Sequence, residues 1–357
     1  MKKYEEIFQD YKNAILNGTY KNGSKLPTEE KIAQQYGTSR VPVQQAMNAL
    51  IGSNLVKRVV GSGTYVTYES NLLGVKNLKT VLLITELNPE TARIMEGVQS
   101  VLHNCGVFVS TRCSYGDASV EREVLEQLKN GEIMGLLFYA NDTNVNIDLI
   151  HELITMRLPL VFVDKLPNDI VCNCVMSDPV VAMQLLVEAL YNKGHRRIGV
   201  ITHDQNKRSS APLRLKMAEM AMNRLGLELP ARYIRSNEDQ VRNLTEMMTQ
   251  SQPPTAIIYT AAVIAYAGHA AFERLGMRVP QDVSIAVYDD IKRFSKVFGL
   301  RLTSVAQDYY GIGRVAAERL YKYMVKPDMR FLVEYMPVTF MQGESVQEIA
   351  PPKAAGK

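Results

Sequence analysis

Apolar side chains recur at helical spacing in three stretches within the first 52 residues. The first stripe ends before Gly18, the second starts after Thr28, and the third starts after Ser39, so each ends or begins at a residue suited to a helix terminus. Pro42 is compatible with the third helix because the amides of a first turn have no intrahelical partner. The predicted buried positions are Tyr4, Ile7, Phe8, Tyr11, Ile15 and Leu16, then Ile32, Ala33 and Tyr36, then Val43, Ala46, Met47 and Leu50.

Two β-branched runs, LVKRVV and TYVTY, follow the third helix and flank Gly61-Ser62-Gly63. A short glycine-containing segment between two such runs is a signal for a β-hairpin. Two helices, a short turn, a third helix and a hairpin are the order of a winged helix-turn-helix. We therefore predict a winged helix-turn-helix over residues 1–68.

The hydrophobic pattern changes after residues 69–79, which show no clear period and which we interpret as a linker. Beyond them, apolar runs of the kind buried on both faces alternate with helical stretches. This alternation predicts βαβ units and parallel sheets with helices on both faces. About 260 residues are many for one sheet, so we expect two α/β lobes with a ligand between them at the carboxyl ends of strands. The runs are VLLIT, GVFVST, GLLFYA, LPLVFVD, RIGVIT, TAIIYT and VSIAVYD, and no internal sequence repeat is visible.

Composition agrees with a globular chain and excludes several classes. Of 357 residues, 46% are hydrophobic and 22% are charged, which excludes disordered and fibrous proteins. No apolar run has the length that a membrane span needs. The first residues have no uninterrupted apolar core of the kind found in a secretory signal, so we expect a cytoplasmic protein.

The net charge of +4 lies entirely in the first segment. Residues 1–68 hold nine basic and five acidic side chains, whereas the other 289 residues hold 32 of each. A helix in the major groove, with Lys and Arg on flanking phosphates, is how a winged module binds a duplex. Arg40 lies in the first turn of the third helix, Lys57 and Arg58 lie on the hairpin, and Gly61 and Gly63 let its tip approach DNA closely. The alternative is that these charges form a solvated face and the glycines only make the turn.

The sequence predicts no catalytic centre, metal site or cofactor. The cysteines Cys105, Cys113, Cys172 and Cys174 are too few and too irregular for a disulfide framework or a zinc site. Cys172-Asn-Cys174 could in principle chelate a metal, but no His or further Cys lies nearby in the sequence. The five histidines are dispersed, and neither a Gly-x-Ser-x-Gly motif nor a phosphate loop is present.

The string GSKLPTEEKIAQQYGTSRVPVQQAMNALIGSNLVKRVVGSGTYV resembles the winged-helix reader of the GntR family over some 45 residues. Shared elements include Leu26-Pro27, Ser39-Arg40 and the closing Gly61-x-Gly63-Thr64-x-Val66. Two residues depart from the pattern, because Glu30 and Gln44 stand where many relatives place arginines that touch DNA. The resemblance implies DNA contacts from the second helix, the third helix and the wing, which here are Lys25, Thr28, Ser39, Arg40, Val41, Gln44, Lys57, Arg58, Gly61 and Gly63.

The remainder of the chain resembles the effector domain of the lactose/galactose repressor family, which is itself similar to periplasmic sugar-binding proteins. The matching pieces are LPLVFVDK, KGHRRIGVIT, PPTAIIYT, GMRVPQDVSIAVYDD and LTSVAQDYYGIGRVAAERL. A GntR reader joined to such a domain resembles the arabinose-repressor group. The effector contacts implied by the resemblance are Asp164, Arg214, Asp289 and Gln307, with Tyr309 as a cover for a sugar ring. The alternative for each is structural, since an Asp at a strand end often caps the next helix.

The expected fold class is therefore α/β multidomain, a winged helix-turn-helix followed by a two-lobed periplasmic-binding-protein-like effector domain over residues 80–345. We expect the first lobe at about 80–176 and 306–330, and the second at about 177–305 and 331–345. Residues 346–357 are expected to form a tail.

Three positions of the expected effector cleft depart from the family. Ala261-Ala262 replaces a usual Asn-Asp pair, Ser177-Asp178-Pro179 replaces an Asp-Asn pattern, and Met217 replaces a glycine. A polar contact that the family pattern includes is therefore missing from the expected cleft. The hypothesis is that the effector is not a typical free hexose or pentose, or that the site is partly degenerate.

These observations predict a ligand-responsive transcriptional regulator, a repressor of genes for carbohydrate uptake or use. A homodimer would bind a pseudo-palindromic double-stranded operator. Two alternatives remain at this point: a solute-binding protein whose N-terminal module does not read DNA, and an enzyme that uses the cleft.

Overall fold

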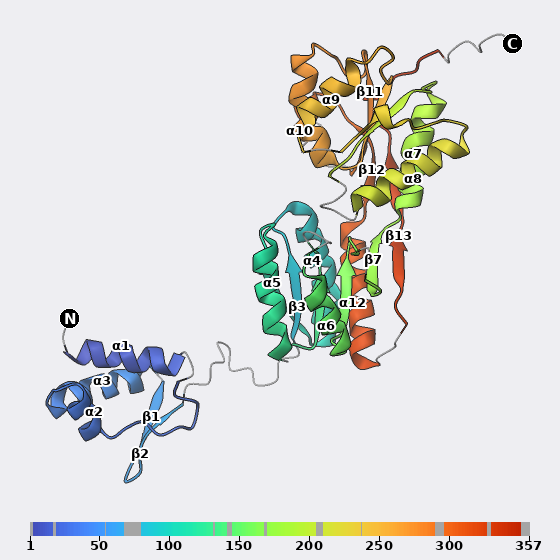
Figure 1. Cartoon of the computed structure of the whole chain (residues 1–357). Coiled ribbons are helices and arrows are strands. Elements are labelled where there is room, and N and C mark those ends of the chain that lie inside the picture. The colour runs from blue at the N-terminus through green and yellow to red at the C-terminus, as the bar shows by residue number, and fades with distance from the viewer. Residues whose placement is uncertain are drawn as a thin grey trace. The chain divides into compact units, whose positions relative to one another are not determined.

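The computed structural model (Figure 1) describes residues 3–16, 19–53, 55–67, 80–130, 133–140, 145–167, 170–204, 210–236, 238–289, 296–326 and 330–350. It divides into two units, Met1–Leu78 and Lys79–Lys357. The expected linker at 69–79 lies outside the described residues.

The first unit has the predicted winged-helix order. Three helices are followed by an antiparallel hairpin, in the sequence α1 (Lys3–Leu16), α2 (Glu29–Gln35), α3 (Arg40–Gly52), β1 (Val56–Val59) and β2 (Gly63–Val66). One core joins the inner faces of the helices to Leu26, Leu55 and Val66. The predicted stripe positions of α2 and α3 are buried apart from Tyr36, which is half-buried like Tyr4 and Phe8.

The second unit contains two six-stranded sheets with the same strand order. The first sheet runs β13-β7-β6-β5-β3-β4 and the second runs β14-β12-β11-β10-β8-β9, so each strand has a counterpart in the other sheet. All pairings are parallel except that of β14 with β12. The strands of the first sheet are β3 (Thr80–Thr85), β4 (Phe108–Cys113), β5 (Gly135–Phe138), β6 (Leu160–Val163), β7 (Asn173–Ser177) and β13 (Val333–Met336). Those of the second are β8 (Ile198–Ile201), β9 (Ile234–Arg235), β10 (Ala256–Tyr259), β11 (Ser284–Tyr288), β12 (Thr303–Gln307) and β14 (Val338–Met341).

Helices cover both faces of each sheet, and each sheet has two hydrophobic clusters. The first lobe holds α4 (Pro89–Leu102), α5 (Ala118–Gln127), α6 (Ile147–Thr155) and α12 (Tyr309–Val325), with short 3-10 turns at His103–Cys105 and Leu128–Asn130. The second holds α7 (Pro179–Asn192), α8 (Ser210–Arg224), α9 (Gln240–Met248), α10 (Ala262–Arg274) and a 3-10 turn at Ala231–Tyr233. The predicted α/β class with two lobes is confirmed.

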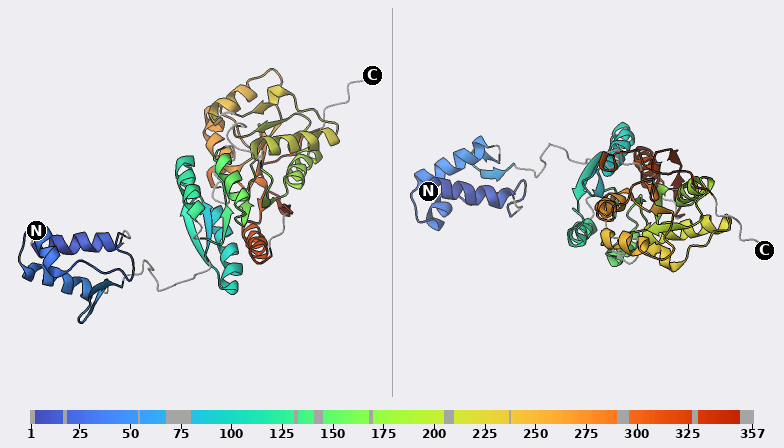
Figure 2. Two further views of the ribbon diagram at one scale, coloured as in Figure 1. Left: turned by 60° about the horizontal axis from the view of Figure 1, so that its bottom comes forward. Right: turned by 90° about the horizontal axis from the view of Figure 1, so that it is seen from above.

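The chain passes between the lobes three times. Asp178 follows β7 and caps α7, and Asp308 follows β12 and caps α12, so each crossing leads from one lobe's sheet to the other lobe's helix. The third crossing is Pro337, between β13 and β14. In the left view of Figure 2 the orange-red α12 lies beside the cyan and green elements of the first lobe.

Two expected boundaries were wrong. Val333–Met336, placed in the second lobe, instead pairs with β7, because the chain that leaves α12 completes the first sheet before it crosses at Pro337. The first part of the expected tail is packed on the second lobe: the amide of Gln347 donates to Ser284 Oγ at 3.1 Å, and that of Ile349 donates to the carbonyl of Lys193 at 2.9 Å. Residues 351–357 lie outside the described residues.

One strand is exposed where burial on both faces was expected. Most side chains of β4 are exposed, including Phe108 at 54%. β4 is the edge of the first sheet and pairs only with β3 among the described strands. A central strand of a parallel sheet needs covering helices on both faces, whereas an edge strand can leave side chains exposed to solvent.

Candidate functional sites

A groove of about 520 Å³ lies in the first unit, between the start of α2, the start of α3 and the wing, β1 to β2. We call it the reading groove. It brings together six of the ten side chains or glycines expected to contact DNA, namely Lys25, Thr28, Arg40, Arg58, Gly61 and Gly63. The sequence stretches that supply them are separated by up to 38 positions, and the packing of the hairpin against the helices brings them together.

The outer face of α3 carries three more of the expected contacts. Val41 is 60% exposed and Gln44 is also exposed, whereas Val43, Ala46 and Met47 on the opposite face are buried. Ser39 is the N-cap residue of α3, but its side chain makes no capping hydrogen bond. Ser39 is exposed, so its hydroxyl is available to a phosphate.

The wing is shaped by its two glycines. Gly61 has φ +74° at the tip, a conformation that side-chain-bearing residues rarely adopt, and the neighbouring Val60 is 97% exposed. At Gly63 an added Cβ would lie 2.6 Å from Lys25 Cε, so the glycine makes room for the Lys25 side chain over the Tyr65 ring. Lys57 is exposed on β1. Thr28 has a structural role besides, because its hydroxyl accepts a hydrogen bond from the Lys31 amide and caps α2.

Both arginines of the reading groove are paired with acidic side chains of α2. Arg40 forms an ion pair with Glu30, and Arg58 forms one with Glu29. The sequence showed that these carboxylates reduce the local charge, but not that they contact the two arginines. Such pairs bridge separate elements and carry no fixed sequence spacing.

Asp164 and Asp289 occupy equivalent places in the two lobes. Asp164 follows β6 and Asp289 follows β11, which is the counterpart of β6. Each donates its amide to the neighbouring strand, to Val175 in the first lobe and to Val305 in the second. Both have positive φ, +67° and +86°. Residues held in this conformation cluster at functional sites.

The five expected effector contacts, Asp164, Arg214, Asp289, Gln307 and Tyr309, lie close enough to interact, and we call them the effector site. Burial raises the pKa of Asp164, and the nearby cations Lys165 and Arg214 only partly offset this. Oδ1 of Asp164 is buried and accepts no hydrogen bond from any described residue, and the same holds for Oε1 of Gln307. The side-chain amide of Gln307 donates to Asp289 and to the Tyr309 hydroxyl, and that hydroxyl donates to Asp289 Oδ1 at 3.0 Å.

Arg214 is held by two groups that the sequence did not indicate. Its guanidinium lies 3.6 Å from the centre of the Tyr288 ring, and its Nη1 donates to the Thr260 carbonyl at 2.7 Å. Burial disfavours the charged guanidinium, but Tyr288, Asp289 and Asp164 outweigh it and raise the pKa of Arg214. Tyr288 ends a continuous apolar strand and is buried in the core of the second lobe, and its place directly before Asp289 is the signal that could have revealed its contact with Arg214.

Lys165 is a second buried cation beside Asp164. It is 7% exposed, its Nζ lies 4.1 Å from the centre of the Tyr139 ring, and it donates to the Ala140 carbonyl at 3.3 Å.

Ala261 is one of the positions where this chain departs from the family pattern. It is the N-cap residue of α10, and its side chain forms no capping hydrogen bond.

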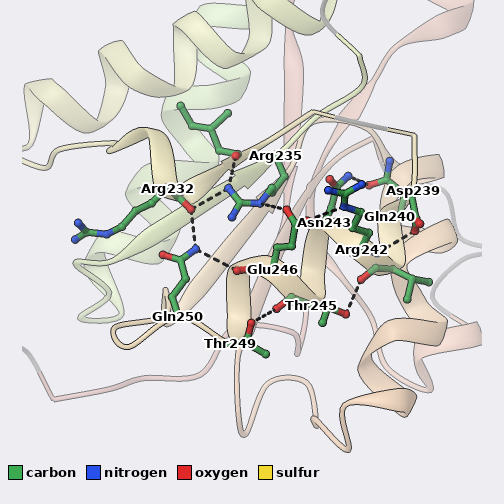
Figure 3. Close-up of polar contacts among 12 residues, drawn as sticks. Arg232, Arg235, Asp239, Gln240, Arg242, Asn243, Thr245, Glu246, Thr249 and Gln250 are labelled. Carbon is green, nitrogen blue, oxygen red and sulfur yellow. Dashed lines mark hydrogen bonds and ion pairs between the residues drawn. The ribbon is translucent and has the colours of Figure 1, made fainter.

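A further polar cluster lies at the edge of the second lobe (Figure 3). Glu246 of α9 accepts from Arg242 Nε at 2.6 Å and pairs with Arg235 of β9 at 3.3 Å. The amide of Gln250 donates to the Arg232 carbonyl at 2.8 Å. The ion pair between Glu246 and Arg235 joins α9 to β9, so we assign the cluster a structural role.

Within the described ranges, no three His, Cys, Asp or Glu side chains are grouped so that they could hold a metal ion. No helix among the described residues has the length and apolar character needed to cross a membrane.

His195 is buried before β8 and forms hydrogen bonds with the Thr255 hydroxyl and the Gln347 carbonyl. Burial lowers the pKa of His195, in agreement with a structural role.

Comparisons with known proteins match both units. The bacterial regulatory proteins of the gntR family match residues 3–66, and the periplasmic binding protein-like domain matches residues 187–346. The ribose operon repressor of Haemophilus influenzae is 28% identical over 301 residues, which are 82% of this chain and 89% of that protein. The arabinose metabolism transcriptional repressor of Geobacillus stearothermophilus is 24% identical over 329 residues, covering 89% of this chain and 90% of that protein. Among solved structures, a LacI family regulator from Enterococcus faecium with bound ribose has a TM-score of 0.63 and 19% identity, covering 76% of this chain and all of that one.

Proposed function

We propose that the protein is a ligand-responsive transcriptional regulator. Its first unit matches the gntR family, and its second unit matches a periplasmic binding protein-like domain. The observation that carries this proposal is the presence of two sites in two units of one chain. One is a groove lined by three basic and two acidic side chains beside the start of α3, and the other is a set of buried polar groups at the strand ends of two lobes. A protein that only bound a solute has no use for the first.

The effector that suits the second site is rich in hydroxyl groups. Asp164 Oδ1 and Gln307 Oε1 are buried acceptors, and Arg214 supplies donors. A hydroxyl both donates and accepts, so a sugar or sugar derivative can satisfy both kinds of group at once. Two similar proteins, the ribose operon repressor and the arabinose metabolism transcriptional repressor, are named for sugars, which supports this class of effector.

Regulation then follows from a difference in affinity between two states. A ligand that contacts both Asp164 and Asp289 favours the closed arrangement of the lobes, and it changes DNA affinity only by its differential affinity for the two states. Such coupling is typically about 1–3 kcal/mol. We further propose a cytoplasmic homodimer that represses genes for carbohydrate uptake or use and binds a pseudo-palindromic operator.

A duplex selected by the full-length protein from a random DNA library tests the DNA-binding part of the proposal. We expect an enriched sequence with two related half-sites, bound far more tightly at 50 mM than at 200 mM salt. Selection of no sequence, or binding that salt does not weaken, contradicts DNA reading and favours the solute-binding alternative.

A thermal-shift screen over sugars, sugar alcohols and sugar phosphates tests the effector part. We expect one class to raise the melting temperature and to change the affinity for the selected duplex. Asp164→Ala is the matched variant, and its melting temperature should no longer respond. A ligand that stabilises the protein but leaves DNA affinity unchanged would contradict the regulatory role. Turnover of a screened sugar would point to an enzyme.

A further inference from the structure

Two carboxylates line the reading groove, where they would face the negatively charged phosphates of a bound duplex. Glu29 and Glu30 both belong to α2, and both are engaged with arginines of other elements, Arg58 on the wing and Arg40 at the start of α3. A carboxylate facing phosphates is repelled, so these residues oppose binding unless they have another task.

The two pairs differ in exposure. The side chain of Glu30 is 70% exposed and that of Arg40 is 59% exposed, so both can reach a ligand at the groove. The side chain of Glu29 is 27% exposed, which fits a carboxylate that mainly holds the wing against α2. Glu30 is therefore the acidic residue that a duplex would meet.

The pairing leaves Arg40 only part of its hydrogen-bonding capacity. A guanidinium has five N–H donors in a planar fork, and the Nη2 group of Arg40 is directed at Glu30 Oε1. To bind a phosphate with its whole fork, Arg40 must leave Glu30 unpaired beside the duplex. A base edge offers an alternative, since guanine O6 and N7 accept from Arg, while the N4 amino group of cytosine donates to a carboxylate.

We propose that Glu30 is a specificity-determining residue, which through its pair with Arg40 penalises contact with DNA of arbitrary sequence and favours a G·C pair at one operator position. The inference rests on the proposed function, because it assumes that the reading groove receives DNA. It explains why the groove carries an exposed carboxylate beside Arg40.

Glu30→Gln tests the inference, measured on the duplex that the wild-type protein selects and on a scrambled duplex of the same composition. We expect about three- to fourfold tighter binding to the scrambled duplex at 50 mM salt, because the released Arg40 gains a phosphate contact. The affinity for the selected duplex should not rise. The affinity of the variant for the scrambled duplex should also fall more steeply with salt. Because the variant makes one additional ionic contact, its loss of affinity between 50 and 200 mM salt should be about 3.5-fold larger than that of the wild type.

Two variants serve as controls. Glu6→Gln removes the same charge from the same unit, but Glu6 pairs with Lys3 at 2.9 Å and does not line the reading groove, so its effect on both duplexes should be small. In an Arg40→Gln background, Glu30→Gln should no longer change the ratio of the two affinities, because Glu30 acts through Arg40. Repeating the selection with Glu30→Gln measures the base preference of the variant. That preference should relax at one position of the operator.

Equal gains on both duplexes would overturn the inference, since they would make Glu30 a diffuse charge and not a reader of sequence. Unchanged affinities and an unchanged salt dependence would overturn it as well. Both results leave the proposed function standing, because wild-type binding is intact. Failure of the wild-type protein to select any duplex defeats the proposed function itself, and this inference with it.

Discussion

Asp164 and Asp289 show how far single residues could be predicted. Their positions after apolar runs indicated strand ends, where ligands bind in α/β lobes. The positive φ of each, and the buried Oδ1 of Asp164 that no described residue satisfies, could not be predicted, because they depend on the neighbouring strand and on the opposite lobe. Such a backbone conformation costs about 1–3 kcal/mol for a non-glycine residue, and the strand pairing on each side sustains it.

Asp164→Asn should stabilise the ligand-free protein at neutral pH and weaken its response to the effector. Burial raises the pKa of Asp164, so the folded protein holds a buried charge at a cost whenever the carboxyl is ionised. Below the ordinary carboxyl pKa of about 4 the group is neutral in both folded and unfolded states, and the variant has no advantage. As the pH rises from there through the raised pKa, the wild type loses stability relative to the variant, whose carboxamide stays neutral.

Thermal unfolding of the two proteins between pH 3.5 and pH 8 measures this difference. Asparagine tolerates positive φ, so the backbone at this position is preserved. A melting-temperature difference that is constant over the whole range would contradict the assigned burial of charge.

Arg40→Ala should weaken binding to the selected duplex by about 1–3 kcal/mol if Arg40 contacts a base. Arg278→Ala is the matched control, because Arg278 is an exposed arginine of the second unit whose partner is Asp282. Equal gel-shift affinity of Arg40→Ala and wild type at moderate salt would exclude the assigned reading geometry.

At the scale of elements, continuous apolar strands and amphipathic helices were predictable, whereas edges and crossings were not. β7 and β13 mix polar and apolar residues, and the position of β13 in the first sheet depends on where α12 ends. β4 was predicted as a strand, but its exposure follows from its place at the sheet edge. Periodicity describes the faces of one element and contains no information about which element lies next to it.

Gly97→Ala should destabilise the first lobe, because α4 and α12 approach through glycines. A Cβ at Gly97 would overlap the Tyr310 carbonyl oxygen, and one at Gly313 would overlap the Ile94 carbonyl oxygen. Neither backbone can move aside cheaply, so we expect a loss of about 1–3 kcal/mol and a lower melting temperature. Gly52→Ala is the control: an added methyl group there meets nothing within 4 Å, and stability should not fall.

Ala261→Ser should stabilise the second lobe by supplying the cap that α10 lacks. Ala261 has the extended backbone of an N-cap residue, φ −157° and ψ 143°, but no side-chain oxygen. Replacing a capping Ser by Ala typically costs about 0.5–2 kcal/mol, so the reverse change should gain a similar amount. Chemical denaturation measures the gain, and a stability equal to or below that of the wild type would show that the buried position cannot hold the hydroxyl.

For the whole molecule, two independent cores predict two unfolding transitions. The first unit has its own hydrophobic cluster, separate from the four clusters of the second. An effector at 100 times its Kd should add about 2.7 kcal/mol to the stability of the second unit only. Calorimetry with and without the effector tests this, and an equal upward shift of both transitions would contradict independent cores.

The division into a reader and a two-lobed domain was predictable because charge and periodicity both change near residue 80. The equivalence of the two lobes was not, since it is a repeat of strand order without a visible repeat of sequence.

The three crossings between the lobes have a consequence for biosynthesis. The first lobe needs α12 and β13, so it cannot be completed until the ribosome has passed Met336, whereas the first unit is complete by Leu78. At about 5–20 residues per second, the roughly 260 residues between these points take about 13–52 s to translate. During that interval each nascent chain carries a complete winged helix and an incomplete first lobe, so the unit proposed to bind DNA can fold before the domain proposed to bind the effector.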